Sequence, residues 1–173
     1  MSYRERILID GRIEWRFIDK STWGKGPWQK EPDKVQWKDK ETGLPCLAVR
    51  HPEFGHWCGY AGVTDENTFF GVDDSACNLD AHGGVNFSSF CDEQDKKKGV
   101  CHIPEPGEPD RVWWFGFDCN HGYDFAPGAT SYFQSVGISS SLGFRGVYRS
   151  LDYVRQQCQR LAAQLKDFKR GEM

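Results

Sequence analysis

The sequence predicts an α+β protein, in which an antiparallel sheet carries a long C-terminal helix packed on one face. Three features lead to this fold class. Apolar and polar residues alternate around turn-forming residues in 7–17 and 35–50, as in β-hairpins. Residues 111–118 form the most apolar run of the chain, as expected of a central strand. From Ser150 onward the apolar spacing changes to three and four, which indicates an amphipathic helix.

A chain of 173 residues fits one domain and can bury a sizeable core without disulfides or metals. We therefore expect a single domain over residues 1–173. Within it the sequence predicts an N-terminal hairpin extension over 1–30, a long loop over 122–146 and a helix over 150–169. A loop of that length inside a compact domain is usually functional or disordered, so we expect it to move without ligand and to order with it.

The strands are placed by their turns. Asp10-Gly11 is the strongest hairpin signal in the N-terminal part. In the second hairpin, Pro45 indicates that the returning strand starts late or lies at an edge. Further strands are expected over 56–63 and 79–87.

The C-terminal helix has the clearest pattern in the chain. Ser150 suits the N-cap, and the basic residues Lys166, Lys169 and Arg170 suit the negative end of the helix dipole. We expect the apolar stripe of this helix to be core. Its members are Leu151, Val154, Cys158, Leu161, Leu165 and Phe168.

The net charge of −3 and the pI of about 5.9 exclude the basic footprint of a nucleic-acid binder. No apolar run approaches the length of a membrane span, so no membrane partner is expected. The charged start Met1–Arg6 is not followed by a signal-like apolar segment. These features favour a cytoplasmic location.

The chain contains seven Cys, an odd number, and no C-x-x-C pair. In a cytoplasmic protein they are expected to be reduced thiols, and a closed structural zinc site is weakly supported. Cys119 is predicted to be a buried small hydrophobe rather than a nucleophile, because free Cys is among the most buried residue types.

The first polar cluster is Asp80-Ala81-His82-Gly83-Gly84. On a strand, Asp80 and His82 share a face, where a carboxylate can orient an imidazole. The paired glycines would admit a ligand close to the backbone, and their amides could form an anion-binding nest. The plain alternative is a β-bulge with a surface histidine.

The second polar cluster, Asp118-Cys119-Asn120-His121 with Asp124, follows the central strand. Asp118 and His121 have the residue types of a general acid/base pair. The alternative is a capped turn in which Asp118 accepts backbone hydrogen bonds.

The two clusters are expected to converge if their strands are neighbours, because side chains of adjacent strands lie within contact distance. Asp80, His82, Asp118 and His121 would then carry acid/base chemistry. The other route is a divalent metal, with His82, Asp118 and His121 as candidate ligands.

Gly116, on the face of Trp114 and Asp118, is expected to leave space for a ligand. The expected ligand-binding residues are Gly83, Gly84, Trp114, Asn120, Tyr123 and Asp124.

The stretches Asp80–Gly84 and Trp114–His121 resemble those of small proteins encoded by phages and prophages. The start of the last helix, Tyr148–Val154, fits the same resemblance, which spans roughly residues 34–168. It implies a phage context and the cytosol of a host cell, but no catalytic residues. Small phage proteins of this size often interfere with host defence, including by binding or cleaving nucleotide signals.

The sequence therefore favours a protein that binds a small anionic ligand such as a signalling nucleotide, and it leaves hydrolysis of that ligand open. One alternative is a sequestering protein without turnover, in which Trp114 and Tyr123 stack on a base. Another is a phage protein that inhibits a host protein through exposed Trp anchors. The ligand, the metal and the oligomeric state, homo-oligomers included, stay open.

Overall fold

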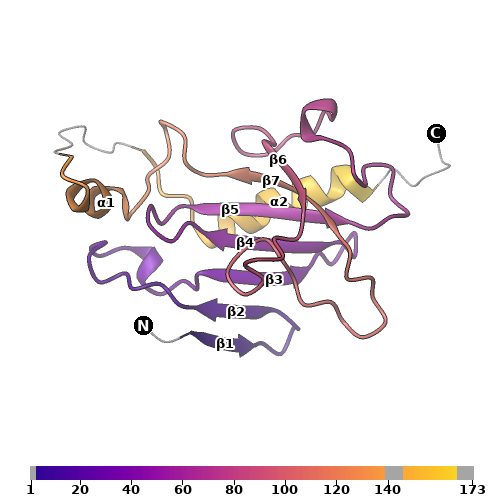
Figure 1. The fold of residues 1–173 in the computed structure, drawn as a ribbon, viewed down its shortest axis with the longest axis horizontal. Helices are drawn as coiled ribbons and strands as arrows, with labels where there is room; N and C mark the ends of the chain where they lie inside the picture. The colour runs from indigo at the N-terminus through magenta and orange to yellow at the C-terminus, as the bar shows by residue number, and fades with distance from the viewer. Residues whose placement is uncertain (1–2, 139–145, 167–173) are drawn as a thin grey trace.

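The computed structural model describes residues 3–138 and 146–166, and its main feature is an antiparallel sheet with a long helix across one face (Figure 1). The α+β prediction is confirmed. The strands are β1 (Arg4–Ile7), β2 (Ile13–Arg16), β3 (Lys34–Lys38), β4 (Pro45–Arg50), β5 (Trp57–Val63), β6 (Phe87–Phe90) and β7 (Trp113–Asp118). The helices are α1 (Ala129–Ser135) and α2 (Leu151–Lys166), with short 3-10 turns η1 (Pro27–Gln29) and η2 (Asp74–Ala76).

The strand order is β1-β2-β3-β4-β5-β7-β6. Both predicted hairpins are present, with Ile7 opposite Ile13 in the first and Lys38 opposite Pro45 in the second. Pro45 is the first residue of β4, a position where the missing N–H is tolerated, and β4 lies inside the sheet rather than at its edge. After β5 the chain leaves the sheet and returns as the edge strand β6. Strand β7 then inserts between β5 and β6.

The predicted apolar stripe of α2 is core as far as the structure describes it. Val154, Cys158, Leu161 and Leu165 are fully buried against the sheet. Burial of each large side chain contributes roughly 1.5–3 kcal/mol. Phe115 and Phe117 of β7, and Cys119 just after it, pack in the same core as this helix, and burial raises the pKa of the Cys119 thiol far above its ordinary value. Cys119 is therefore a packing residue, as predicted.

The opposite face of β7 is also packed. Trp114 is fully buried with Leu47, Tyr60 and Val112, so the prediction that Trp114 contacts a ligand is wrong. The space at Gly116 is filled as well, because a Cβ there would lie 2.4 Å from Cδ1 of Tyr60. The glycine of β7 accommodates an aromatic ring of β5 and leaves no room for a ligand.

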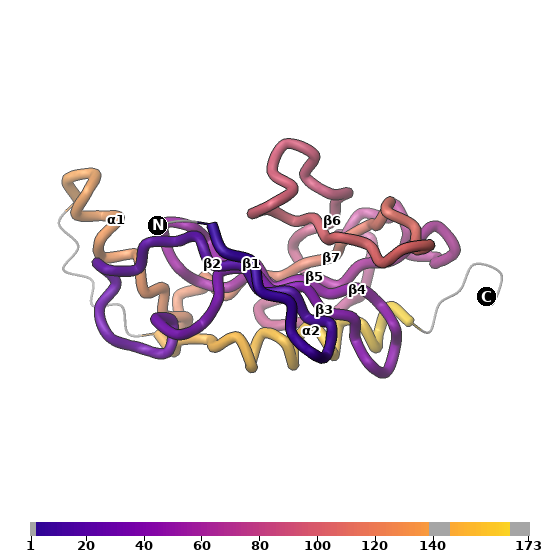
Figure 2. The backbone as a smooth tube through the Cα atoms, turned by 90° about the horizontal axis from the view of Figure 1, so that it is seen from below, coloured from indigo at the N-terminus to yellow at the C-terminus, as the bar shows by residue number. Residues whose placement is uncertain are grey.

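A disulfide joins Cys91 to Cys101, whose Cα atoms are 4.7 Å apart. The prediction that every Cys is a reduced thiol is therefore wrong for this pair, while the other five are free. The chain leaves β6 at Phe90 and doubles back on itself, which brings the two sulfur atoms together. The resulting loop 91–101 lies on the side of the sheet opposite α2 (Figure 2).

Residues 79–86 do not form the predicted strand, and β6 begins only at Phe87. The reason lies in Gly83 and Gly84, whose φ angles are +69° and +94°. Extended strands need negative φ, so two such residues in succession break the strand. The Gly84 amide donates to the Ala81 carbonyl at 2.8 Å and closes a turn, so it is not free to bind an anion. The segment still runs beside β7, because the Asn86 amide donates to the Gly116 carbonyl at 3.0 Å.

The segment predicted as a loop over 122–146 is not all loop, because it contains α1. The remaining part, 139–145, lies outside the described residues, and so do residues 167–169 of the predicted C-terminal helix. None of the described helices has both the length and the hydropathy to cross a membrane.

Candidate functional site at Asp124

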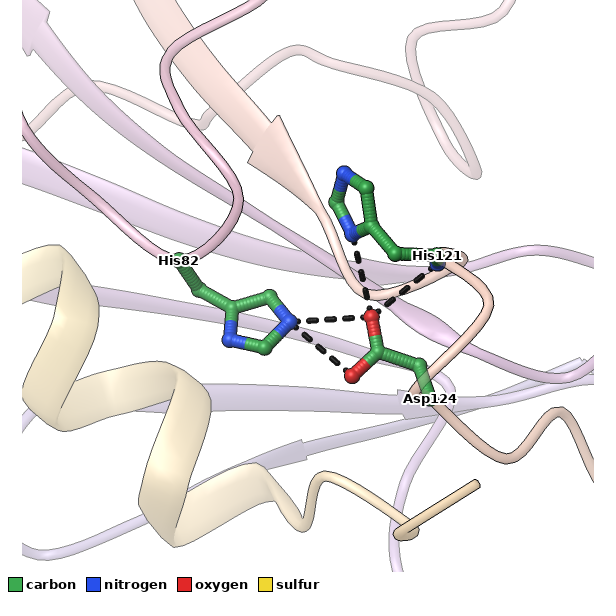
Figure 3. Close-up of side chains that lie close together, drawn as sticks. All are labelled: His82, His121 and Asp124. Carbon is green, nitrogen blue, oxygen red and sulfur yellow. Dashed lines mark hydrogen bonds and ion pairs between the residues drawn. The ribbon is translucent and has the colours of Figure 1, made fainter. Parts of the chain in front are cut away.

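His82 and His121 lie together, with ring centroids 5.6 Å apart (Figure 3). They meet through Asp124, which was expected at the site but not as its centre. His82 Nε2 lies 2.9 Å from each carboxylate oxygen, and His121 Nδ1 lies 3.0 Å from Oδ2. Asp124 therefore holds both rings, in the place that the sequence assigned to Asp80 and Asp118.

The backbone of Asp124 is held in place by a turn and by a short β-bridge. Its amide donates to the His121 carbonyl at 2.9 Å, which closes a tight turn after β7. A short parallel bridge then pairs Asp124 with Val147. This close approach requires Gly146, because a Cβ there would lie 2.2 Å from the carbonyl carbon of Asp124. The turn and the bridge together aim the carboxylate at the rings.

The carboxylate of Asp124 has 0% side-chain exposure and is surrounded by donors. Oδ2 accepts from the His121 amide at 3.1 Å and from both rings, and Oδ1 accepts from His82 and from Arg149 Nε at 2.9 Å. Burial alone would raise the pKa of Asp124. The hydrogen bonds from His82, the His121 amide and Arg149 outweigh burial, so the pKa lies below its ordinary 3.8.

An ionised carboxylate only accepts hydrogen bonds, and this fixes the protons of both rings. His82 must carry its proton on Nε2 and His121 on Nδ1, because these nitrogens face Asp124. His82 Nδ1 is then an acceptor and lies 2.7 Å from the Tyr153 hydroxyl. Burial raises the pKa of Tyr153, so the phenol keeps its proton and donates it. When His82 and His121 are both neutral, three of their four ring nitrogens form hydrogen bonds with described residues. The fourth, His121 Nε2, has no hydrogen bond among the described residues.

His121 is also the accessible histidine of the pair, with 27% of its side chain exposed. Its ring lies between Gly83 and Tyr123. A Cβ at Gly83 would lie 2.2 Å from Cε1 of His121, so this glycine admits the imidazole and not a ligand, as had been expected. Tyr123 stacks on the other side with ring centroids 5.2 Å apart, and this residue is 51% exposed. Asp118 Oδ1 lies 3.5 Å from His121 Nε2.

His82, His121 and Asp124 are the one group among the described residues whose potential metal-ligating atoms converge, all within 4.8 Å of one another. Such a set of two imidazoles and a carboxylate suits zinc or another first-row transition metal. However, the Asp124 oxygens already accept from both rings, the His121 amide and Arg149. A metal would have to replace the ring N–H donors, so the observed geometry favours a hydrogen-bonded centre.

The other predicted residues have different places. The Asp80 carboxylate binds Arg160 of α2 at 2.7 Å, and the Asp80 amide donates to the side chain of Gln164. Both groups therefore contact α2 and not the two imidazoles. The prediction that Asp80 orients His82 is therefore wrong, and its cause is the missing strand over 79–87. Asn120 and Gly84 are exposed, and no described contact joins them to the rings.

Arg149 and Tyr153 complete the site and were not predicted there. Arg149 lies two residues before α2 and Tyr153 lies in its first turn, both far along the chain from His82. Arg149 lies over the Tyr153 ring at 5.1 Å, so the two side chains support each other. In the sequence Arg149 was one of several isolated basic residues. Tyr153 lies beside the apolar stripe in the sequence, next to Leu151 and Val154. This position at the edge of the buried face of the helix is the signal that could have suggested a contact with the site.

Comparison with family models, with curated proteins and with solved structures found no match for this chain. The candidate function therefore depends on the geometry of the site alone.

Proposed function

We propose that this protein binds a small anionic ligand, of the kind that a signalling nucleotide represents, beside His121 and hydrolyses it. The observation that carries the proposal is the proton arrangement around Asp124. It leaves the lone pair of His121 Nε2 available on an accessible ring, while both nitrogens of His82 are occupied. A carboxylate that holds the far nitrogen of a histidine is the usual support of a general base.

Arg149 is the anchor for the anion in this proposal. Its Nε is bound to Asp124, and no described residue bonds its terminal nitrogens. Those nitrogens can form the paired contacts that phosphate and carboxylate oxygens favour. The charges of Arg149 and Asp124 balance, so an arriving anion would be held by directed hydrogen bonds rather than by a strong field.

In the reaction, His121 Nε2 takes a proton from a water molecule while the water oxygen attacks the phosphorus atom of a phosphate ester or anhydride, and the bond from phosphorus to the leaving oxygen breaks. The imidazolium is stabilised by Asp124 through Nδ1–H, and it then returns the proton to the leaving group. Asp118, near Nε2, would stabilise the protonated state. Asp124 and His82 act as positioning residues, because they reach the ligand only through His121 or not at all.

The test is turnover of a panel by the purified protein. The panel contains bis(p-nitrophenyl) phosphate, nucleoside diphosphates and triphosphates, and cyclic dinucleotides, each measured with and without EDTA. The sharpest variant is His121→Asn, because the Asn amide keeps a donor near the Nδ1 position but removes Nε2. We expect it to lose turnover by a factor of 100 or more, within the range of general-base catalysis, and to melt close to the parent.

The matched control is Asp80→Asn, a carboxylate that the structure places outside the cluster. It should keep parental turnover. Full activity of His121→Asn, or equal losses in both variants, would contradict the proposal. Loss of parental activity in EDTA would replace the hydrogen-bonded centre by a metal centre at the same three residues.

Sequestration without turnover is the second candidate, and the exposed ring of Tyr123 favours it. A stacked Tyr123–His121 pair is a platform for a flat base. Saturable binding of a panel member with no turnover, lost in Tyr123→Ala, would select this function.

The third candidate, inhibition of a host protein, loses its expected anchors. Six of the seven Trp are buried and Trp113 is half-buried, so exposed Trp side chains are not its basis. The phage context and the cytosolic location are likewise proposals. The Cys91–Cys101 disulfide counts against the cytosol, because cytosolic reductants keep most such pairs reduced.

A further inference from the structure

A second site is suggested by a cavity of about 810 Å³ beneath loop 91–101. It is separate from the Asp124 cluster, none of whose residues line it. Its walls include Tyr3, Trp15 and Val112. The two cysteines of the disulfide, Cys91 and Cys101, also line it. Cavities of roughly 300–1,000 Å³ with apolar walls and a few polar groups are the usual form of small-molecule sites.

Lys34 is the polar group in this cavity that matters most. It is 1% exposed, and its Nζ donates to the carbonyls of Lys96 and Lys97 at 3.2 and 3.3 Å. It also lies 5.1 Å from the Trp15 ring centroid. No carboxylate among the described residues lies within ion-pair distance of this ammonium. A buried cation without a counter-charge is unfavourable.

The other buried cations show how unusual this is. Lys20 Nζ lies 2.5 Å from the Asp33 carboxylate, and Arg50 lies 3.4 Å from both Asp33 and Glu31. Both are held by carboxylates within the protein. Lys34 alone among the buried cations described has no carboxylate within ion-pair distance. Its close partners are two carbonyls and a ring face, and the charge of Asp95 acts on it only from farther away. The position of a close counter-charge is therefore open to an anion that enters the cavity.

The acidic residues at the rim do not supply that anion. Glu5 accepts the Trp15 indole N–H at 2.8 Å, and Glu93 pairs with Lys96 at 3.0 Å. The other charged side chains at the rim are Lys97, Arg111 and Asp110. The cationic side chains that line the cavity, Lys34, Lys96, Lys97 and Arg111, therefore outnumber its carboxylates by one.

We propose that this cavity binds a small monocarboxylate with an apolar body. The carboxylate would receive a hydrogen bond from Lys34 Nζ, which has a third N–H beyond the two used by the loop carbonyls. The apolar body would lie against Trp15, Tyr3 and Val112. Loop 91–101 closes the site, because its carbonyls orient the ammonium and its disulfide fixes the loop. The proposal is independent of the function assigned to His121.

The experiment is calorimetric titration of the intact, oxidised protein with octanoate, indole-3-acetate and benzoate, and with the uncharged amide of each. We expect at least one acid to bind, with a Kd at least 10-fold lower than that of its amide. This comparison uses the parent alone and needs no variant. The failure of all three acids to bind, or equal affinity for an acid and its amide, would overturn the proposal.

Lys34→Met then tests the residue, because Met keeps an unbranched apolar stem and removes the charge. It should abolish the preference for acid over amide while the amide still binds. Lys25→Met, at an exposed lysine that does not line the cavity, is the control and should keep the 10-fold preference. An unchanged preference in Lys34→Met would overturn the assignment. Because Lys34 and His121 belong to different sites, neither result alters the expected turnover at His121.

Discussion

Asp124 and Lys34 are both buried charges, but the protein treats them in opposite ways. Asp124, near the start of α2, accepts hydrogen bonds from two imidazoles, a backbone amide and a guanidinium. Lys34, beneath loop 91–101, has two carbonyls and, among the described residues, no carboxylate within ion-pair distance. A buried charge whose partners are complete acts as a fixed point that orients its neighbours. A buried charge whose partners are incomplete leaves a position for a ligand.

The largest loss of stability is expected from Asp124→Asn, which disrupts the hydrogen bonds that the Asp124 carboxylate accepts. The neutral amide cannot accept from all the donors, so Arg149 and His82 remain buried or half-buried without their acceptor. Removal of one partner of a buried pair typically lowers the free energy of unfolding by about 3–5 kcal/mol. Urea denaturation measures it.

The control for this prediction is Asp80→Asn, whose exposed pair with Arg160 should contribute within about 0.5 kcal/mol. If Asp124→Asn were as stable as Asp80→Asn, Asp124 would not be the centre of the cluster. The comparison with Lys34 would then fail.

The second prediction concerns the loop that covers Lys34. Cys91→Ser removes a disulfide between residues 10 apart in sequence, and closing a loop of that size contributes about 3 kcal/mol in the chain-entropy model. We expect this loss in urea denaturation, together with weaker binding of the carboxylate probes. Cys77→Ser, at a half-buried free thiol, is the control and should change neither.

Alkylation of the unfolded, unreduced protein followed by mass spectrometry gives an independent check. Five modified cysteines are expected, and seven would show that loop 91–101 is open and the cavity lacks its cover.

The hairpins and the helix could be predicted from sequence because their signals are local. Asp10-Gly11 sets a turn between neighbours in the chain, and the stripe from Leu151 to Leu165 repeats within one helix. Asp124 as the centre could not be predicted, since it depends on contacts between His82, the turn after β7 and Arg149. Such contacts join residues dozens of positions apart.

The errors also have physical causes. An alternating pattern placed Asp80 and His82 on one strand face, but the positive φ angles of Gly83 and Gly84 ended the strand. The odd number of Cys suggested free thiols, although Cys91 and Cys101 flank a charged loop whose ends meet. Glycine next to a candidate site was read as room for a ligand. In the structure Gly83 and Gly116 make room for His121 and Tyr60.

The third prediction separates the two histidines. His82→Ala removes both ring hydrogen bonds of a buried residue and leaves Asp124 and Tyr153 short of a partner, so we expect a loss of about 1–3 kcal/mol. At roughly 2–4 °C per kcal/mol, the melting temperature should fall by several degrees. His121→Asn should melt within about 2 °C of the parent while losing turnover. The reverse order of melting temperatures would show that His121 is the structural member of the pair.

The last prediction uses the incomplete partners of Lys34. Burial lowers the pKa of Lys34 from 10.5 to about 8, with Asp95 opposing part of the shift. The unfolded chain therefore binds more protons than the folded protein between pH 8 and 10.5, and stability from this residue must rise with pH across that interval. Between pH 7 and pH 9 the gain amounts to about 1 kcal/mol.

Other groups of the protein also change protonation across this pH interval, so the gain must be measured as a difference between two proteins. Lys34→Met keeps those groups and lacks the titrating amine. The free energy of unfolding of the parent, relative to Lys34→Met, should increase from pH 7 to pH 9 in ligand-free urea titrations. A difference that is flat or falls with pH would mean that the pKa of Lys34 is not lowered in the folded protein. Its ammonium would then already have enough partners, and the distinction from Asp124 would disappear.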